Sequence, residues 1–125
     1  MADIVPFHGL HFATDVEGGL ESVVAPPYDV ISAEERDRLA RLNPRNIVRV
    51  ILNAPEPGDS PDAPYKRAAA FLRRWQDEGA LVEDPDAALY LYRQTFQNPL
   101  TAQTETRTGL FCALKLSPYT DGVVL

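Results

Sequence analysis

Polar and apolar positions follow a helical spacing in the middle of the chain. Small, aliphatic and aromatic residues recur at three- and four-residue steps, and lysine and arginine fill the positions between them. The stripe consists of Tyr65, Ala68, Ala69, Leu72, Trp75 and Gln76. Ser60 or Asp62 is placed to cap such a helix, and Gly79 can supply its left-handed C-terminal residue. The pattern therefore predicts an amphipathic helix that ends before Gly79.

A second helix is predicted by the capping box Ser32-Ala33-Glu34-Glu35, in which the serine hydroxyl accepts a hydrogen bond from the third helical amide. It should run from about Ala33 to Leu42 and end just before the next proline. Residues 47–52 form a short run rich in β-branched side chains, which predicts a mostly buried strand. Residues 54–61 contain three prolines and one glycine, and this composition predicts a loop.

Two segments rich in aromatic and branched residues, 88–96 and 108–116, predict an antiparallel hairpin joined by the polar stretch 97–107. Aromatic residues alternate with leucines in the first segment, so we expect both faces of the hairpin to be covered. Asp121-Gly122 predicts a tight turn, followed by a new apolar strand over residues 123–125. Together the elements predict an α+β fold, with two main helices packed on a mixed, mainly antiparallel sheet.

Length and composition fit one globular domain over residues 1–125. A single cysteine cannot form an internal disulfide, which excludes the small secreted scaffolds. The apolar runs are far shorter than the roughly 20 residues of a membrane-spanning helix, and the first residues lack a signal-peptide pattern. We therefore expect a cytoplasmic protein without a membrane partner. The apolar end at Leu125 favours an N-terminal fragment of a longer protein.

The charge balance argues against a nucleic-acid partner. Eighteen acidic residues face 12 basic ones, for a net charge of −6. Affinity for duplexes comes mainly from neutralising phosphates, which an acidic protein does poorly. Residues 36–49 form a basic island of five arginines and one aspartate, whose ordinary interpretation is a solvated helix face with ion pairs.

The segment before the capping box is the strongest candidate site. Two prolines place a stiff corner between an apolar strand end and a helix N-terminus, where unpaired amides favour bound anions. Glu34 and Glu35 already bring negative charge to that turn, so the corner suits a magnesium-bound phosphate, or a hydroxyl or amine that Asp29 holds or deprotonates. Asp29 is the candidate catalytic residue. The candidate ligand-binding residues are Pro26, Pro27, Tyr28, Asp29, Ser32 and Arg49.

Arg49 joins this set because it lies between apolar neighbours in the predicted strand, on the same face as Ile47 and Ile51. A buried guanidinium needs a partner, and we hypothesise that the partner is Asp29 or a ligand phosphate. The alternative is that Arg49 extends to solvent at a sheet edge while Asp29 makes a local Asx turn.

Other signals for chemistry are weak. His8 and His11 stand three residues apart without a further histidine, so we predict no metal site. Cys112 lies between leucines at alternate positions, which favours a packed thiol over a nucleophile. The sequence contains neither a glycine-rich phosphate loop nor a Gly-x-Ser-x-Gly elbow.

Four segments resemble the N-terminal part of the bacterial and archaeal domain of unknown function 1015 family. The segments are 4–10, 23–32, 43–52 and 122–125. The second contains the distinctive block Pro26-Pro27-Tyr28-Asp29, and the resemblance covers essentially the whole chain. It implies a considerably longer parent protein.

That family is distantly similar to ParB and sulfiredoxin-like folds, some of which bind nucleotides and include a free-serine kinase. The resemblance implies that Tyr28 and Asp29 border a nucleotide or amino-acid pocket, with Mg²⁺ bridging phosphates and Arg49 balancing charge in phosphoryl transfer. Two functions follow as expectations. One is part of a nucleotide-binding or small-molecule (amino acid) phosphotransferase, and the other is a noncatalytic binding or scaffold module that self-associates as a homo-oligomer through the strand at Leu125.

Overall fold

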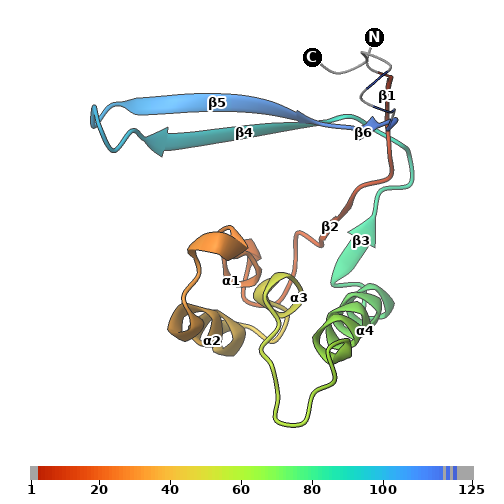
Figure 1. Ribbon diagram of the computed structural model, residues 1–125. Helices are drawn as coiled ribbons and strands as arrows, with labels where there is room; N and C mark the ends of the chain where they lie inside the picture. Colours follow the sequence, from red (N-terminus) through yellow and green to blue (C-terminus); the bar gives the residue numbers. More distant parts are fainter. Residues whose placement is uncertain (1–2, 117, 119, 121–125) are drawn as a thin grey trace. The chain divides into compact units, whose positions relative to one another are not determined.

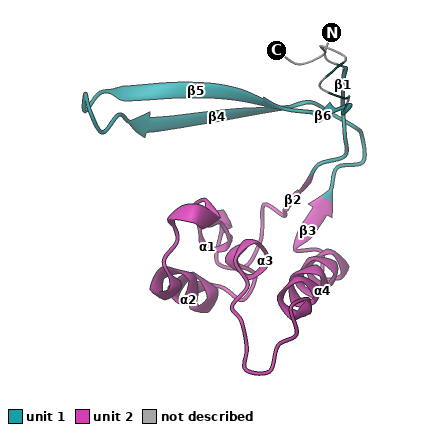
Figure 2. Cartoon of the chain, viewed as in Figure 1, with its two compact units in different colours: residues 1–9, 83–125 teal, residues 10–82 magenta. Residues whose placement is uncertain are grey.

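The computed structural model describes residues 3–116, 118 and 120, within which the chain forms two compact units (Figure 2). One unit contains residues 1–9 and 83–125, and the other contains residues 10–82. The mixture of helices and short strands confirms the α+β class. The expectation of one domain over residues 1–125 stays a prediction.

The elements follow one another along the chain as shown in Figure 1. In order they are β1 (Ile4–Val5), β2 (Leu10–Phe12), α1 (Leu20–Val23), a 3-10 turn (Tyr28–Val30), α2 (Ala33–Leu42), α3 (Val48–Ile51), α4 (Ala63–Asp77), β3 (Leu81–Glu83), β4 (Tyr90–Gln97), β5 (Thr104–Phe111) and β6 (Ala113–Leu114).

Helix α2 has the bounds that the capping box predicted. The Ser32 hydroxyl accepts a hydrogen bond from the Glu35 amide at 3.1 Å, which satisfies one of the free donors of the first turn. Leu39 is buried, while Arg38 forms an exposed ion pair with Glu35 one turn earlier. The sequence signals for α2 were all local, and the predicted helix is confirmed.

Helix α4 is also confirmed, and it carries the core of residues 10–82. Trp75 is fully buried together with Ala80 and Leu81, and partly buried side chains pack around this cluster. These side chains are Phe12, Ile47, Val50, Phe71 and Leu72. Gly79 ends the helix with a φ of 71°, as predicted. The proposed stripe extends too far, because Tyr65 remains 77% exposed.

The predicted strand over residues 47–52 is wrong, because Val48–Ile51 forms the short helix α3. Asn46, just before it, is fully buried and accepts a hydrogen bond from the Val48 amide at 3.0 Å through its side-chain oxygen. This side-chain bond stabilises a helical turn that β-branched residues alone do not favour. A short apolar run does not distinguish a strand from a buried helix, and here the tertiary contacts of Asn46 decide.

The expected single sheet is also corrected. Within residues 3–116 the strands form three separate two-stranded ladders, β1 with β6, β2 with β3 and β4 with β5. In the unit of residues 10–82, α3 contacts both α2 and α4, so the two main helices pack around a third helix and not on a broad sheet. Apart from the predicted hairpin, the sequence pattern contained no information on which strands would pair.

The β4–β5 hairpin is confirmed, with a shorter connection than predicted. The ladder pairs residues one to one from Tyr90↔Phe111 to Gln97↔Thr104, so the second strand begins four residues before the expected position 108. Its faces are not covered as expected, because Leu91 is 79% exposed and Phe111 is also exposed. The turn and strand predicted over 121–125 lie outside the described residues.

Tyr90 fixes the base of this hairpin to the first residues of the chain. Its hydroxyl donates to Asp84 Oδ2 at 2.6 Å and accepts from the Gly9 amide at 2.6 Å. The bond to the Asp84 carboxylate raises the pKa of the Tyr90 phenol above its ordinary value. A Cβ atom on Gly9 would lie 2.5 Å from the Tyr90 ring, so this close approach requires glycine.

Candidate functional site

The diproline corner lies at the surface of the unit formed by residues 10–82. Tyr28 and Asp29 begin a 3-10 turn in which the Val30 amide donates to the Pro27 carbonyl at 3.1 Å. Tyr28 is 65% exposed, and Pro26, Pro27 and Asp29 are exposed as well. The corner therefore presents its side chains to solvent, not to a hollow.

The backbone that leads into this corner is nevertheless held in place. The Ile47 amide donates to the Val23 carbonyl at 2.7 Å, and the Asn46 side chain donates to the Val24 carbonyl at 2.9 Å. Both bonds connect the segment to the start of α3, and Val23 is fully buried. The corner is thus anchored at its base, as a stiff display of exposed groups.

Ser32 and Arg49 do not join the corner residues. The Ser32 hydroxyl is occupied in capping α2. The expected pairing of Arg49 with Asp29 is not formed, because Arg49 Nη2 donates to the Ala40 carbonyl at 2.6 Å and its guanidinium lies 5.7 Å from the centre of the Phe71 ring. The physical reason is that residue 49 lies in a helix and not in the predicted strand, so its side chain points towards α2 and not towards Asp29.

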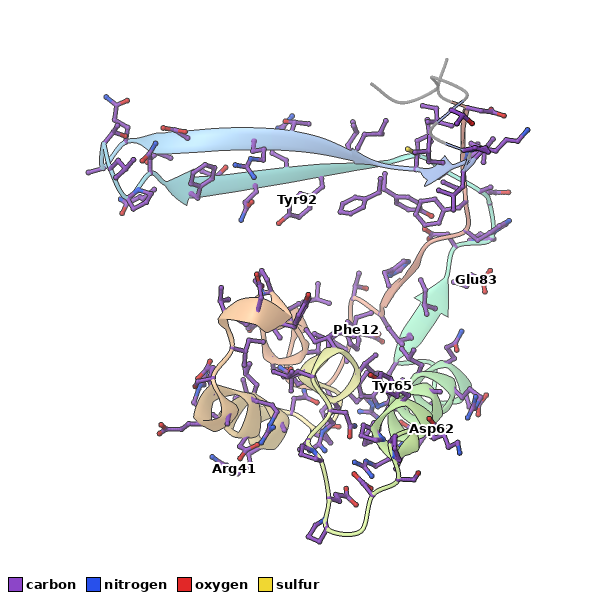
Figure 3. The ribbon with its side chains drawn as sticks, in the orientation of Figure 1. Phe12, Arg41, Asp62, Tyr65, Glu83 and Tyr92 are labelled. Atoms are coloured by element: carbon purple, nitrogen blue, oxygen red, sulfur yellow. The ribbon has the colours of Figure 1, made fainter. Side chains whose placement is uncertain are left out.

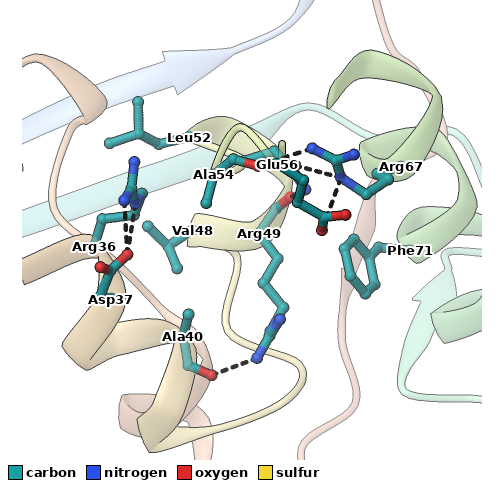
Figure 4. A pocket seen from close by; sticks show the side chains of 11 residues that line it. Arg36, Asp37, Ala40, Val48, Arg49, Leu52, Ala54, Glu56, Arg67 and Phe71 are labelled. Carbon is teal, nitrogen blue, oxygen red and sulfur yellow. Dashed lines mark hydrogen bonds and ion pairs between the residues drawn. The ribbon is translucent and has the colours of Figure 1, made fainter. Parts of the chain in front are cut away.

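Arg49 lines a cavity of about 90 Å³ between α2, α3, α4 and the loop after α3 (Figure 4). The other lining residues are Arg36, Asp37, Ala40, Val48, Leu52, Asn53, Ala54, Glu56, Arg67 and Phe71. This lining includes neither Ser32 nor any of the corner residues 26–29. The structure therefore brings one of the six predicted site residues to a cavity and leaves the other five elsewhere.

Of the three arginines that line the cavity, two form ion pairs with carboxylates, and Arg49 forms none with the described residues. Arg36 pairs with Asp37 at 2.8 Å, and Arg67 pairs with Asp59 at 2.7 Å. Arg49 has no carboxylate partner among the described residues, and its buried Nε makes no hydrogen bond there. Glu56, which also lines the cavity, lies 3.5 Å from Arg67 Nε, so Arg67 faces two carboxylates while Arg49 faces none within ion-pair distance among the described residues.

Arg67 builds the opposite wall of the cavity. Two of its nitrogens donate to the two oxygens of Asp59, each at 2.7 Å, and further bonds reach Asn53 and the Ala54 carbonyl at 3.0 and 2.8 Å. The guanidinium lowers the pKa of the Asp59 carboxyl from 3.8 to about 2, chiefly through these hydrogen bonds. Arg67 thus holds the proline-rich loop against α4.

This pair gives the stability of the protein an acid-dependent component. Because the pKa of Asp59 is lower in the folded protein, its contribution is fully present above 3.8 and is lost as the pH falls towards about 2. Melting temperatures measured across that range should therefore decline less steeply for Asp59→Asn than for the wild type. Arg67→Met should flatten the decline in the same way, since Arg67 causes most of the shift. Equal slopes in all three proteins would contradict this role.

The sequence did not identify Arg67 or Asp59 as parts of a site. Arg67 was assigned to the polar side of the α4 stripe, and Asp59 was one acid in a turn-rich loop. Their pairing spans eight residues and depends on how the loop folds back on the helix. The available signal was an arginine one helical turn before Phe71, a residue that the predicted stripe also left out.

The described residues contain no group of three or more histidine, cysteine, aspartate or glutamate side chains placed to hold a metal ion. His8 Nδ1 lies 2.9 Å from the Asp84 carbonyl oxygen and is engaged with backbone. In the same part of the chain, no helix combines the length and apolarity of a membrane span.

The family of this chain is identified by a protein-family model. The model of the family described as "Protein of unknown function (DUF1015)" matches residues 4–125. The chain belongs to this family. The match confirms the resemblance seen in the sequence, and it assigns no activity to the DUF1015 region. No curated protein and no solved structure matches the chain. The similarity to ParB-like folds stays a prediction.

Proposed function

We propose that this DUF1015 region is a binding module for a small molecule that carries a phosphate or carboxylate group, with Arg49 as the anion-binding residue. The observation that carries the proposal is the unmatched guanidinium at the cavity. Arg49 has five N–H donors, of which the structure occupies one with the Ala40 carbonyl, and its Nε is buried without a partner in the described residues. A bound anion would supply Arg49 with both a direct countercharge and the missing acceptors.

The size of the cavity defines the kind of ligand. About 90 Å³ is room for a few water molecules, and therefore for one phosphate or carboxylate group. The rest of a ligand would extend out of the cavity along the loop after α3. Nucleotides and amino acids both carry such a group, so the expected ligand classes remain compatible with this geometry.

Binding is favoured over phosphoryl transfer by the position of the acids. A transferase needs a carboxylate that accepts the proton of the attacking hydroxyl, close to the bound phosphate. Asp29 does not line the cavity, and the two carboxylates that do, Asp37 and Glu56, are already paired with Arg36 and Arg67. We therefore propose the noncatalytic role for these residues, in a cytoplasmic setting that suits the free thiol of Cys112.

The proposal is tested by titrating the full chain with sodium phosphate, sodium pyrophosphate and sodium acetate. In ¹⁵N-labelled protein the arginine Nε–H signal of Arg49 should shift on addition of one of these anions, because that group gains an acceptor. Calorimetry should give a dissociation constant that rises at least roughly tenfold in Arg49→Met, as expected for the loss of one charge-assisted contact.

Arg41→Met is the matched control, since Arg41 is exposed on α2 and does not line the cavity (Figure 3). It removes the same charge and should leave both the affinity and the Arg49 signal unchanged. Equal weakening in the two variants would mean that only net charge attracts the anion, and unchanged binding in Arg49→Met would overturn the assignment.

A further inference from the structure

Among the residues that the structure describes, nothing pairs with the outer edge of β5 over the eight residues of the strand, and this edge is self-complementary. The ladder in this part of the chain contains β4 and β5 alone, and a two-stranded hairpin by itself is only marginally stable in water. We propose that two copies of this chain pair edge to edge through β5, antiparallel and centred on Thr106, to form a four-stranded sheet. The proposal is independent of the Arg49 cavity, because it concerns residues 104–111 alone.

Hydrogen bonding within the hairpin determines which residues of β5 face outward. The Asn98 amide donates to the Gln103 carbonyl at 2.8 Å, and the pairing continues one to one beyond it. Alternate pairs of an antiparallel ladder exchange hydrogen bonds, so the backbone groups of Glu105 and Arg107 point to β4. Those of Thr104, Thr106 and Thr108 point outward. They are a free row of donors and acceptors, which is a template for another strand.

Charge selects one register for that second strand. With the two-fold axis at Thr106, Glu105 lies opposite the partner's Arg107, and the same pair forms again across the axis. These are pairs without backbone hydrogen bonds, whose Cα atoms approach to about 4.5 Å. An axis at Glu105 or at Arg107 would place like charges opposite each other, which destabilises a ladder.

The remaining positions support the same choice. An axis at Thr108 would place Arg107 opposite the partner's Gly109 and form no charge pair. The Thr106 axis also places threonines opposite threonines on the other face, a favourable cross-strand combination of β-branched residues. The row of outward positions contains neither lysine nor proline, and the unbroken register excludes a bulge there, so β5 lacks the usual protections of a free edge.

The edge of β4 is less suitable. Its outward positions include Arg93, so pairing centred there would place two arginines opposite each other. Centring on Thr95 would place Gln94 opposite the partner's Phe96, without a charge pair. The Thr-Glu-Thr-Arg-Thr sequence of residues 104–108 is therefore the self-complementary edge of this hairpin.

A cysteine cross-link tests the register. At the proposed axis the two Thr106 Cα atoms would lie about 5.5 Å apart, within the roughly 4.4–6.8 Å range of a disulfide. In a Cys112→Ala background, Thr106→Cys should form a disulfide-linked dimer under mild oxidation. Thr104→Cys is the matched control, because the two copies of residue 104 would be separated by about 13 Å along the strands. Equal cross-linking of both variants, or none in Thr106→Cys, would overturn the proposal.

Charge reversal tests the pairing without a covalent link. By analytical ultracentrifugation, Arg107→Glu should raise the dimer dissociation constant at least roughly tenfold, because two attractive pairs become repulsive. The combined exchange Glu105→Arg with Arg107→Glu should restore dimerisation, since it recreates both pairs. A wild-type chain that remains monomeric up to about 1 mM contradicts the proposal, as does a dimer that responds to neither change.

Discussion

Replacing Trp75 with alanine is expected to lower the free energy of unfolding by about 3–5 kcal/mol, as large-to-small changes in well-packed cores do. Trp75 is fully buried in the only cluster that joins α4 to β3 in the described residues, and its ring lies 6.0 Å from Phe12 and 5.7 Å from Phe71. Its removal would leave a cavity in this cluster. The change is measured by urea unfolding followed by far-ultraviolet circular dichroism. Tryptophan fluorescence is not suitable, because the variant lacks the single tryptophan of the chain.

Two further variants separate packing from hydrogen bonding. The indole Nε1 is buried without a partner in the described residues, so Trp75→Phe loses volume but no hydrogen bond and should cost less than half as much as alanine. Tyr65→Ala, on the same helix at 77% exposure, should change stability by no more than about 0.5 kcal/mol. A Trp75→Ala variant as stable as Tyr65→Ala would show that this cluster is not the core.

The elements predicted correctly from the sequence have local causes. Helix α2 depends on a serine and a glutamate three residues apart, α4 depends on periodicity, and the hairpin depends on two strong strand segments. Each cause lies within a few residues of its effect. Propensity and pattern are therefore sufficient for these elements.

The incorrect predictions with the largest consequences concern interactions between distant residues. Helix α3 depends on Asn46, whose side chain bonds to Ser22 and Val24, 24 and 22 residues earlier in the chain. Likewise, β1 pairs with β6 across most of the sequence. The spacing of apolar residues in a sequence cannot identify such distant partners. The single sheet was predicted because it is the commonest way for strands like these to pack with helices.

The candidate site shows the same division. An arginine between apolar neighbours correctly indicated a half-buried guanidinium in need of an acceptor. The choice of Asp29 as its partner failed, because that choice required residues 47–52 to be a strand. The sequence indicated that the Arg49 guanidinium needs an acceptor, but the direction of its side chain depends on whether residue 49 lies in a helix or in a strand.

Replacing Asn46 with alanine should also destabilise the protein, by about 3–5 kcal/mol. Asn46 is 0% exposed, and its side chain donates to the carbonyls of Ser22 and Val24 at 2.8 and 2.9 Å while it accepts from the Val48 amide at 3.0 Å. Alanine would leave the Val48 amide and the Ser22 carbonyl buried without partners, each at a cost of about 1–3 kcal/mol before relaxation, and would also remove the partner of the partly buried Val24 carbonyl. Urea unfolding measures the total, and Ser32→Ala, which removes an exposed helix cap, should lose only about 1 kcal/mol.

The same change should release the diproline corner, because two of the bonds that hold its base belong to Asn46. Hydrogen exchange of the Ile47 amide, which donates to the Val23 carbonyl, should then accelerate in Asn46→Ala but not in Ser32→Ala. Asn46→Asp sharpens the test, since it preserves shape and the acceptor but turns an oxygen towards two carbonyls. If the aspartate variant unfolded at the urea concentration of the wild type, shape alone would account for this residue, and the hydrogen-bonded anchor of the corner would have to be abandoned.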